Sequence, residues 1–172
     1  PPNAEVHVAI SGGASALIAS PLPGLTMPEV TASFEWLLRS GMDIHQVNAV
    51  RKRLTRWSAG RLALALAPRR CILWLISDVP GDQPESIASG PCSGDPWRSD
   101  DVVALAEVRH ALDPISSAVA TALRRETPKP GDRYLVGIVP HVVANNARAL
   151  AAAAECAARD GIASTIAASP LA

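Results

Sequence analysis

The run of side chains from Cys71 to Ile76 (CILWLI) is apolar at every position. A strand without alternation between apolar and polar positions is typical of a parallel sheet buried on both faces. Three further apolar runs are short enough to be strands, at His7–Ile10, Tyr134–Val139 and Ile162–Ala167. The sequence therefore predicts a mostly parallel sheet in which the strand at Cys71–Ile76 is buried on both sides.

Segments with helical signals alternate with these strands. Thr26 and Glu29 form a capping-box pattern around Pro28, and Gly41 ends the helix that follows. The predicted helices are Met27–Arg39, Ile44–Leu54, Ala59–Leu66, Asp101–Leu112, Pro114–Arg125 and Asn146–Arg159. This alternation predicts an α/β fold, a three-layer sandwich with a mostly parallel, Rossmann-like sheet and right-handed crossovers.

Length and charge limit the class of protein. A chain of 172 residues is long enough for one domain with a substantial core. Its 16 basic and 16 acidic residues balance, which disfavours nucleic acid and anionic membranes as partners. No apolar run approaches the roughly 20 residues of a membrane span. Three widely spaced cysteines predict reduced, mostly buried thiols in a cytoplasmic protein.

The two ends of the sequence resemble cuts through a longer protein. Pro1 stands where an initiator methionine is expected, and no basic or apolar segment of a secretion signal follows it. Ala172 comes directly after the last predicted strand. We therefore expect residues 1–172 to form one α/β domain that is incomplete at both ends.

The loop Ser11-Gly12-Gly13-Ala14-Ser15 directly follows the first predicted strand. Ligands of open α/β sheets bind at the carboxyl ends of strands. The two glycines let the backbone approach a ligand and present N–H groups to an anion, and Ser11 and Ser15 add hydroxyl groups. The loop matches neither the Walker A pattern nor the GxGxxG fingerprint. A plain strand-to-helix turn explains it equally well.

Two carboxylates, Asp78 and Asp82, lie on a bent loop after the strand at Cys71–Ile76. One or two carboxylate oxygens are the usual protein ligands of nucleotide-bound Mg²⁺. Either carboxylate is also suited to accept a proton from a substrate hydroxyl. The alternative is that Asp78 caps a turn and Asp82 is solvated.

Asn145 precedes the Ala-rich helix that begins at Asn146. Asparagine is an ordinary cap at this position. A helix N-terminus near a strand end also favours anions, so Asn145 is a second candidate for phosphate or substrate binding.

Arg51 projects into the apolar sector of the helix Ile44–Leu54, whereas Arg53 falls on the opposite side, where we expect solvent. Asn48 and Lys52 form a polar wedge beside Arg51. A guanidinium in such a place needs a partner, because an unpaired buried charge is costly. An internal carboxylate such as Asp78 supplies one solution, and a substrate carboxylate or phosphate supplies another.

Four blocks resemble the catalytic domain of the MOFRL-associated glycerate 2-kinases. The first is the loop that begins SGGAS, where Ala14 replaces a glycine of the family pattern. The others are SGMDIHQVNAVRKRLT from Ser40, the pair LISDVPGD and IASGP, and ETPKPG from Glu126. Their order and spacing fit across nearly the whole chain. A further departure is the stretch Trp57-Ser58-Ala59-Gly60, which differs from the family's lysine-containing pattern.

The resemblance implies a kinase that uses ATP and Mg²⁺ to phosphorylate D-glycerate, normally at the 2-hydroxyl. It also implies that the active site lies between this domain and a C-terminal MOFRL domain, which this chain lacks. Members also carry the name hydroxypyruvate reductase, but a dinucleotide fingerprint is missing from this sequence. The fragment alone is expected to be inactive, with an exposed apolar surface where its partners pack. A homodimer is left open.

Phosphoryl transfer depends mainly on positioning and charge neutralisation, which suggests roles for the candidate residues. Arg51 and Lys52 are assigned to anionic groups of glycerate or the phosphates, and Asn48 to the substrate. The loop Ser11–Ser15 cradles an anion. Asp78, with Asp82 as helper, binds Mg²⁺ or orients the attacking hydroxyl. The alternatives are a non-catalytic module that binds small anionic metabolites and an inactive, truncated remnant.

Overall fold

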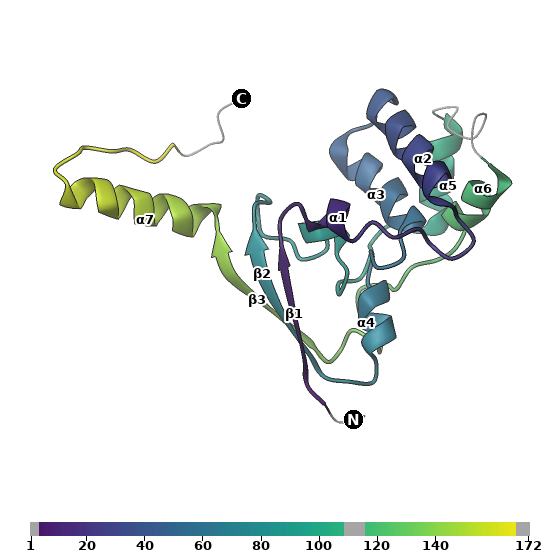
Figure 1. Ribbon diagram of the computed structural model, residues 1–172, viewed down its shortest axis with the longest axis horizontal. Coiled ribbons are helices and arrows are strands. Elements are labelled where there is room, and N and C mark those ends of the chain that lie inside the picture. The colour runs from purple at the N-terminus through teal and green to yellow at the C-terminus, as the bar shows by residue number, and fades with distance from the viewer. Residues whose placement is uncertain (1–3, 109–115, 168–172) are drawn as a thin grey trace.

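The computed structural model describes residues 4–108 and 116–167, and its centre is a three-stranded parallel sheet. The strands, in spatial order, are β1 (Val6–Ser11), β2 (Cys71–Ser77) and β3 (Ile138–Asn145). Val6 pairs with Cys71, and Cys71 pairs with Ile138, so all three strands begin at one edge of the sheet and end at the other (Figure 1). The predicted α/β class with a parallel sheet is confirmed.

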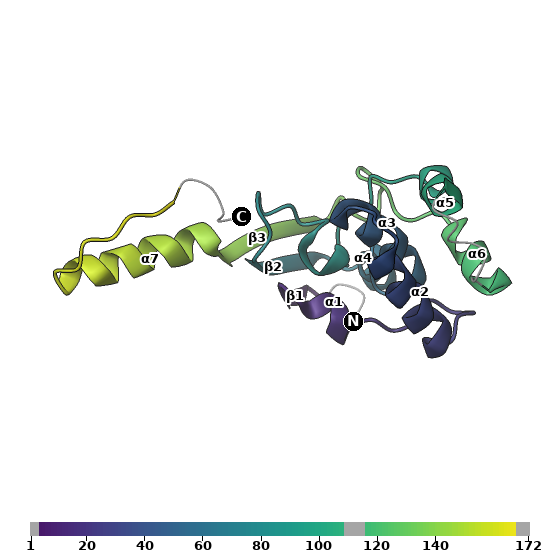
Figure 2. The ribbon, with the colours of Figure 1, turned by 90° about the horizontal axis from the view of Figure 1, so that it is seen from above.

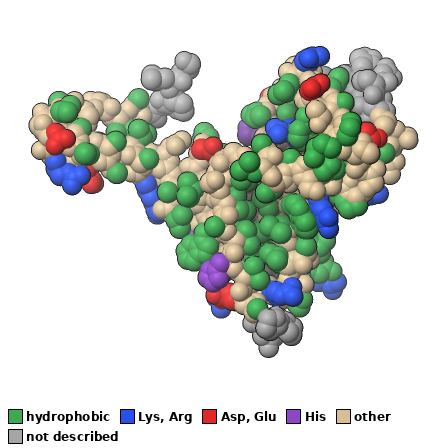
Figure 3. Space-filling model, viewed as in Figure 1, with side chains coloured by type: hydrophobic (Ala, Val, Ile, Leu, Met, Phe, Trp, Pro, Cys, Tyr) green, Lys and Arg blue, Asp and Glu red, His purple; other side chains and the backbone are tan. Residues whose placement is uncertain are grey.

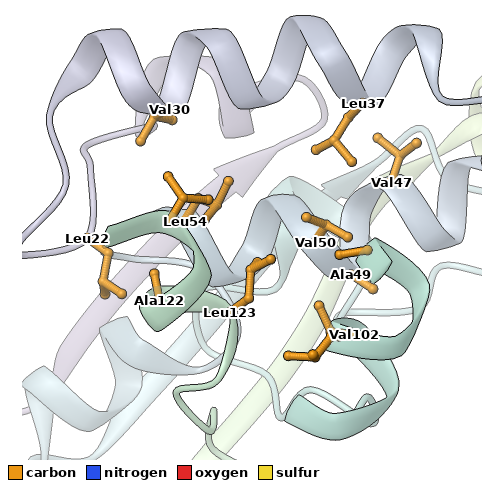
Figure 4. Close-up of a cluster of buried hydrophobic side chains, with 13 residues drawn as sticks. Leu22, Val30, Leu37, Val47, Ala49, Val50, Leu54, Val102, Ala122 and Leu123 are labelled. Carbon is orange, nitrogen blue, oxygen red and sulfur yellow. The ribbon is translucent and has the colours of Figure 1, made fainter. Parts of the chain in front are cut away.

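Four helices gather beside the sheet, and their core is separate from that of the sheet. They are α2 (Met27–Arg39), α3 (Ile44–Leu54), α5 (Ser99–Val108) and α6 (Ser117–Leu123). Figure 4 shows how side chains from these helices, such as Leu37, Val50 and Leu123, point toward one another. The capping boxes of Thr26 with Glu29 and of Asp43 with Gln46 fix the starts of α2 and α3, as local sequence signals do.

The second core lies against the sheet. Ala63 of α4 (Arg61–Leu66) and Ile87 of the single 3₁₀ turn η1 (Ile87–Ser89) pack with Cys71, Leu73 and Leu75 of β2. A short helix, α1 (Ala14–Leu17), follows β1, and the long helix α7 (Asn146–Arg159) projects away from the body (Figures 1 and 2). None of the described residues of α7 is buried.

Only one face of β2 is covered by the described residues, so the prediction of burial on both faces is wrong for this chain. Cys71, Leu73, Leu75 and Ser77 are buried, whereas Ile76 is 51% exposed. Trp74 lies on the open side, stacked between the rings of His7 and His141. Figure 3 shows hydrophobic side chains gathered at the molecular surface. An apolar run predicts that a strand is buried, but which of its faces is buried depends on the segments that pack against it.

The third strand begins later than predicted. Residues 134–137 form turns in which the Leu135 and Ile138 amides donate to the carbonyls of Asp132 and Leu135. β3 starts at Ile138, where pairing with Cys71 becomes available. The run Ile162–Ala167 forms no strand, because these exposed residues pair with nothing in the described sheet.

The predicted bounds of α7 match the structure, whereas α4, α5 and α6 differ from prediction at their ends. α4 begins at Arg61 rather than Ala59, and α5 begins at Ser99 rather than Asp101. The predicted end of α5 at Leu112 and start of α6 at Pro114 lie outside the described residues. In residues 4–108 and 116–167, every helix is too short or too polar to cross a membrane.

Candidate active site at the carboxyl edge of the sheet

Ser11, Ser77 and Asn145 are the last residues of the three strands, so the parallel sheet brings them to one edge. We call the residues around this edge the strand-edge site. They are the Ser11–Ser15 loop, Ser77, Asp78, Asp82, Ser89, Asn145 and Arg148. Most of the residues predicted from sequence to form a binding site thus belong to one region of the fold, as the rule for open α/β sheets leads one to expect.

Asp78 lies directly against Gly12. A Cβ placed on Gly12 would come 2.2–2.3 Å from the carboxyl group of Asp78, so a larger residue here would have to displace the Asp78 side chain. The Gly12 amide donates to the carbonyl of Ile76 at 3.1 Å, which ties the loop to the end of β2. Gly13 has a left-handed φ of 76° and turns the chain into α1. Gly12 therefore permits the close approach of backbone and carboxylate, and Gly13 permits the turn into α1.

Ser15 is linked to a strained turn. Its hydroxyl lies 3.0 Å from the hydroxyl of Ser89. Ala88, Ser89 and Gly90 have φ values of 51°, 64° and 60°, a left-handed run that costs non-glycine residues about 1–2 kcal/mol each. Hydrogen bonds from the Ala59 and Gly60 amides to this turn hold it in place. The turn fixes the position of Ser15, so this hydroxyl is already engaged within the protein.

Asp82 is joined to β3 through Asn145. The Asn145 side chain donates to the Asp82 carboxylate at 2.5 Å and also caps α7 by accepting from the Arg148 amide. Hydrogen bonds from Ser77 and Asn145 lower the pKa of Asp82, and the charge of Arg148 adds to the effect. Asp82 is therefore a partly exposed carboxylate that stays ionised at neutral pH. Asn145 acts as the cap that the sequence indicated and as a bridge that it did not.

Arg148, Ser77 and Ser89 are members of the site that sequence reasoning missed. Arg148 donates to the carbonyls of Val142 and Val143 at 3.1 and 2.8 Å, which places a cation next to the end of β3. Its position three residues after Asn145, in the first turn of an otherwise uncharged stretch of helix, is a signal that could have identified it.

The carboxylates of the strand-edge site fit a magnesium ion only in part. No cluster of three or more His, Cys, Asp or Glu side chains suited to a metal exists in residues 4–108 and 116–167. Magnesium in nucleotide sites commonly takes only one or two carboxylates and completes its shell with phosphates and water. Asp78 and Asp82, both at the carboxyl edge and both oxygen donors, meet that smaller requirement.

Arg51 and Lys52 have neighbours other than those that sequence suggested. The Arg51 guanidinium lies over the Phe34 ring at 4.5 Å from its centroid, and partial burial lowers its pKa. Lys52 is only 6% exposed, and its Nζ lies 4.0 Å from Oδ1 of Asp95. Burial lowers the pKa of Lys52, while the charges of Asp95 and Glu85 oppose the shift. Asn48 is half-buried on the same helix.

Arg53, expected in solvent, is fully buried, so that prediction is wrong. Its guanidinium donates to the carbonyls of Arg125 and Trp97 at 2.7 and 2.6 Å and to the Glu126 carboxylate at 2.9 Å. Asp95, also fully buried, lies 3.5 Å away. We call Arg53, Asp95, Glu126, Lys129 and Lys52 the Arg53 network. It forms because the chain around Trp97 and Arg125 closes over the polar side of α3, which a helical wheel does not show.

The thiols have no part in either region. Cys71 and Cys92 are buried free cysteines, as predicted, whereas Cys156 is exposed. Burial raises the pKa of Cys92 to about 12, so it is a protonated thiol at neutral pH rather than a nucleophile.

The family of this chain is decided by comparison with known proteins. The family model described as "Domain of unknown function (DUF4147)" matches residues 2–124. The chain belongs to the DUF4147 family. An Agrobacterium vitis protein named "Putative hydroxypyruvate reductase" is 40% identical to this DUF4147 chain over 162 residues, which are 94% of the chain and 36% of that protein. The D-glycerate 2-kinase of Thermotoga maritima is 34% identical over 143 residues, which are 83% of the chain and 33% of the relative.

A solved structure agrees with the sequence relatives. The crystal structure of glycerate kinase from Thermotoga maritima matches this DUF4147 chain with a TM-score of 0.82 and 32% identity. The match covers 93% of the chain and 37% of that protein. The resemblance to glycerate 2-kinases predicted from four sequence blocks is confirmed. The chain spans only about a third of the length of these relatives.

Proposed function

We propose that this DUF4147 chain is part of a larger kinase that transfers phosphate from ATP to D-glycerate, at the 2-hydroxyl. The observation that carries the proposal is the convergence of the Ser11–Ser15 loop, Asp78, Asp82 and Asn145 at one sheet edge. Relatives named glycerate kinase support the choice of substrate. Because the chain spans about a third of those relatives, the activity is proposed for the longer protein.

The Ser11–Ser15 loop is the proposed phosphate-binding element. A Cβ at Gly13 would meet no atom within 4 Å, so an anion can approach the backbone there, whereas the Gly12 amide already donates to the Ile76 carbonyl. Ser11 supplies a hydroxyl, while the hydroxyl of Ser15 is held by Ser89. Arg148 adds a positive charge near the end of β3. Oriented donors and a nearby cation are the features that stabilise a transferring phosphoryl group.

The two carboxylates have different environments and hence different proposed roles. Asp82 is stabilised as an anion by Ser77, Asn145 and Arg148, which suits a metal ligand better than a proton acceptor. Asp78 lies against the phosphate loop at Gly12, where it is placed to bind metal or to orient the attacking hydroxyl. When bound, Mg²⁺ neutralises charge on the phosphates of ATP.

The residues of α3 are proposed for the glycerate end of the cleft. Arg51 offers a guanidinium, a good bidentate partner for the substrate carboxylate, and Asn48 lies on the same helix. Lys52 keeps its Asp95 partner, so we propose that it positions α3 electrostatically as well as facing the phosphates. The rest of the longer protein completes the cleft, and this chain alone is expected to be inactive.

Calorimetric titration tests the proposal on the longer protein that includes this chain. D-glycerate and ATP, with and without Mg²⁺, are titrated into the wild type and into Asp78→Asn. We expect ATP binding to depend on Mg²⁺, and Asp78→Asn to weaken it at least tenfold. Asp100→Asn, an exposed carboxylate of α5, is the matched control and is expected to bind normally.

The phosphorylated product distinguishes the proposal from its alternative. Position-specific detection of phosphate on glycerate is expected to give the 2-phosphate. Binding of glycerate with no response to ATP and Mg²⁺ would favour a non-catalytic module for small anions and would contradict the kinase assignment.

A further inference from the structure

A cavity lies at the opposite edge of the sheet from the strand-edge site. It has a volume of about 550 Å³ and is lined where β2 and β3 begin, at Cys71 and Ile138. The strands are parallel, and six residue steps separate Cys71 from Ser77, so about 20 Å of strand separates this cavity from the site proposed for phosphate transfer. A ligand here therefore does not compete with one at the strand-edge site.

The cavity floor is apolar. Ala63 and Cys71, which are 2% and 1% exposed, form part of the lining together with Leu64 of α4 and Ile138. Its volume falls within the roughly 300–1,000 Å³ typical of small-molecule sites. The floor is suited to the apolar body of a ligand, such as an aromatic ring or a branched aliphatic chain.

Three arginines surround this floor. Arg69, Arg70 and Arg133 line the cavity, and their side chains are exposed. Arg133 is ordered by Tyr134, since its guanidinium lies 4.7 Å from the ring centroid and donates to the phenolic oxygen at 2.5 Å. Arg70 forms an ion pair with Glu5 at 3.5 Å. Among the described residues, Glu5 is the acidic partner of these three guanidinium groups. The rim of the cavity therefore carries an excess of positive charge beside its apolar floor.

We propose that this cavity binds a small anion with an apolar body, of the class of aromatic or branched aliphatic carboxylates and their phosphate counterparts. The guanidinium groups bind the anionic end, since the planar fork of arginine matches carboxylate and phosphate oxygens. The apolar body of the ligand packs against the apolar floor. The site is independent of the proposed kinase activity and lies on residues that neither the strand-edge site nor the Arg53 network uses.

Phenyl phosphate is the probe for the first experiment, which uses the 172-residue chain and two-dimensional NMR of its amides. We expect saturable shifts at Ala63, Leu64 and Ile138. Phenol lacks the charge and inorganic phosphate lacks the ring, so each is expected to bind at least tenfold more weakly. Saturable shifts confined to the strand-edge site, or absent at millimolar phenyl phosphate, overturn the proposal.

Two kinds of variant test separately how the arginine charges and the cavity volume contribute to binding of phenyl phosphate. Gly137 lines the cavity, its φ is not left-handed, and a Cβ there meets no atom within 4 Å, so Gly137→Val adds bulk at the cavity lining without left-handed backbone strain. We expect it to weaken binding, and Arg70→Gln with Arg133→Gln to weaken binding tenfold or more. Arg39→Gln, an exposed arginine on α2, is the matched control. Unchanged affinity in both Gly137→Val and the double variant overturns the proposal.

The same NMR measurement distinguishes failure of this proposal from failure of the proposed kinase function. ATP with Mg²⁺ is expected to shift amides of the Ser11–Ser15 loop and Asp78, whereas phenyl phosphate is expected to shift those beside Cys71. Loss of either response without the other shows which of the two proposals has failed.

Discussion

The Arg53 network and the strand-edge site both contain acidic and basic groups, but the charges are buried and paired in the network and accessible in the site. In the network, fully buried Arg53 and Asp95 have fixed partners from three segments. In the strand-edge site, Asp82 is a partly exposed carboxylate that is oriented by Ser77 and Asn145. The difference teaches that buried pairing fixes the fold, whereas an oriented and accessible carboxylate remains available to a ligand.

The largest expected effect comes from breaking the network at Arg53. Arg53→Met leaves Asp95 buried without its nearest cation and removes donors to the carbonyls of Arg125 and Trp97. The free energy of unfolding, measured with urea, is expected to fall by about 3–5 kcal/mol. Arg56→Met, at an exposed arginine that lies over Trp57, is expected to cost less than about 1 kcal/mol. Equal losses in the two variants would contradict a special role for buried pairing.

Acid is expected to weaken the Arg53 network through Glu126. Burial alone raises the pKa of Glu126, but hydrogen bonds from Lys129, the Ser99 and Thr127 amides and Arg53 outweigh it and hold this pKa far below the usual 4.5. A carboxyl with a lowered pKa in the folded state stabilises the protein above its unfolded pKa and loses that contribution as pH falls. Stability is therefore expected to decline as pH falls below about 5.

Glu126→Gln tests this pH dependence. Urea unfolding at several pH values between neutral and strongly acidic is expected to show a flatter decline for the variant than for the wild type. Asp82→Asn, at the strand-edge site, is the comparison, and its effect on the slope is expected to be smaller, because Asp82 accepts mainly from the neutral groups of Ser77 and Asn145, whereas Glu126 is held by the cations Arg53 and Lys129. A larger change for Asp82→Asn would reverse our contrast between the regions.

A smaller effect is expected at Asn145, which serves both a helix and a site. Asn145→Ala removes the cap of α7 and is expected to destabilise that helix by about 1 kcal/mol. Faster amide exchange in the first turn of α7 measures this loss. The variant also removes a donor to Asp82, so the pKa of Asp82, followed by carboxyl NMR, is expected to rise toward its ordinary value. Asn146→Ala, the neighbouring position inside the helix, should leave that pKa unchanged.

The smallest expected effect concerns the contact between Ser15 and Ser89. Ser15→Ala removes a part-buried hydroxyl contact of 3.0 Å, which is worth about 1 kcal/mol or less. In the longer protein, the loosened loop is expected to weaken ATP binding by more than this loss of stability suggests. Ser164→Ala, at an exposed position near the end of the described chain, is the control. Unchanged ATP affinity in Ser15→Ala would exclude the loop from nucleotide binding.

Local signals in the sequence predicted parts of the fold well. The capping boxes at Thr26 and Asp43 act within one turn of helix, and the predicted bounds of α2 and α3 match the structure. β3 was placed too early, because the apolar run from Tyr134 does not reveal where pairing with Cys71 begins. Strand register depends on a partner distant in sequence, and a single run of residues does not contain that information.

In the candidate site, too, the sequence predicted local features but not contacts between distant segments. Glycines, serines and carboxylates after predicted strands identified Gly12, Asp78, Asp82 and Asn145 as candidates, since parallel strands end at a common edge. The position of Arg148 in the first turn of α7 is a sequence signal, but its hydrogen bonds to carbonyls at the end of β3 depend on the tertiary structure and could not be predicted.

The sequence by itself determined the α/β class, the capped helices and the chemistry available after each strand, because these depend on neighbours along the chain. Only the tertiary structure decided which charges are buried. Arg53 lies on the polar side of its helix, yet the segments around Trp97 and Arg125 close over it. A guanidinium tolerates such burial only when distant carbonyls and carboxylates satisfy it, and their meeting is a property of the fold as a whole.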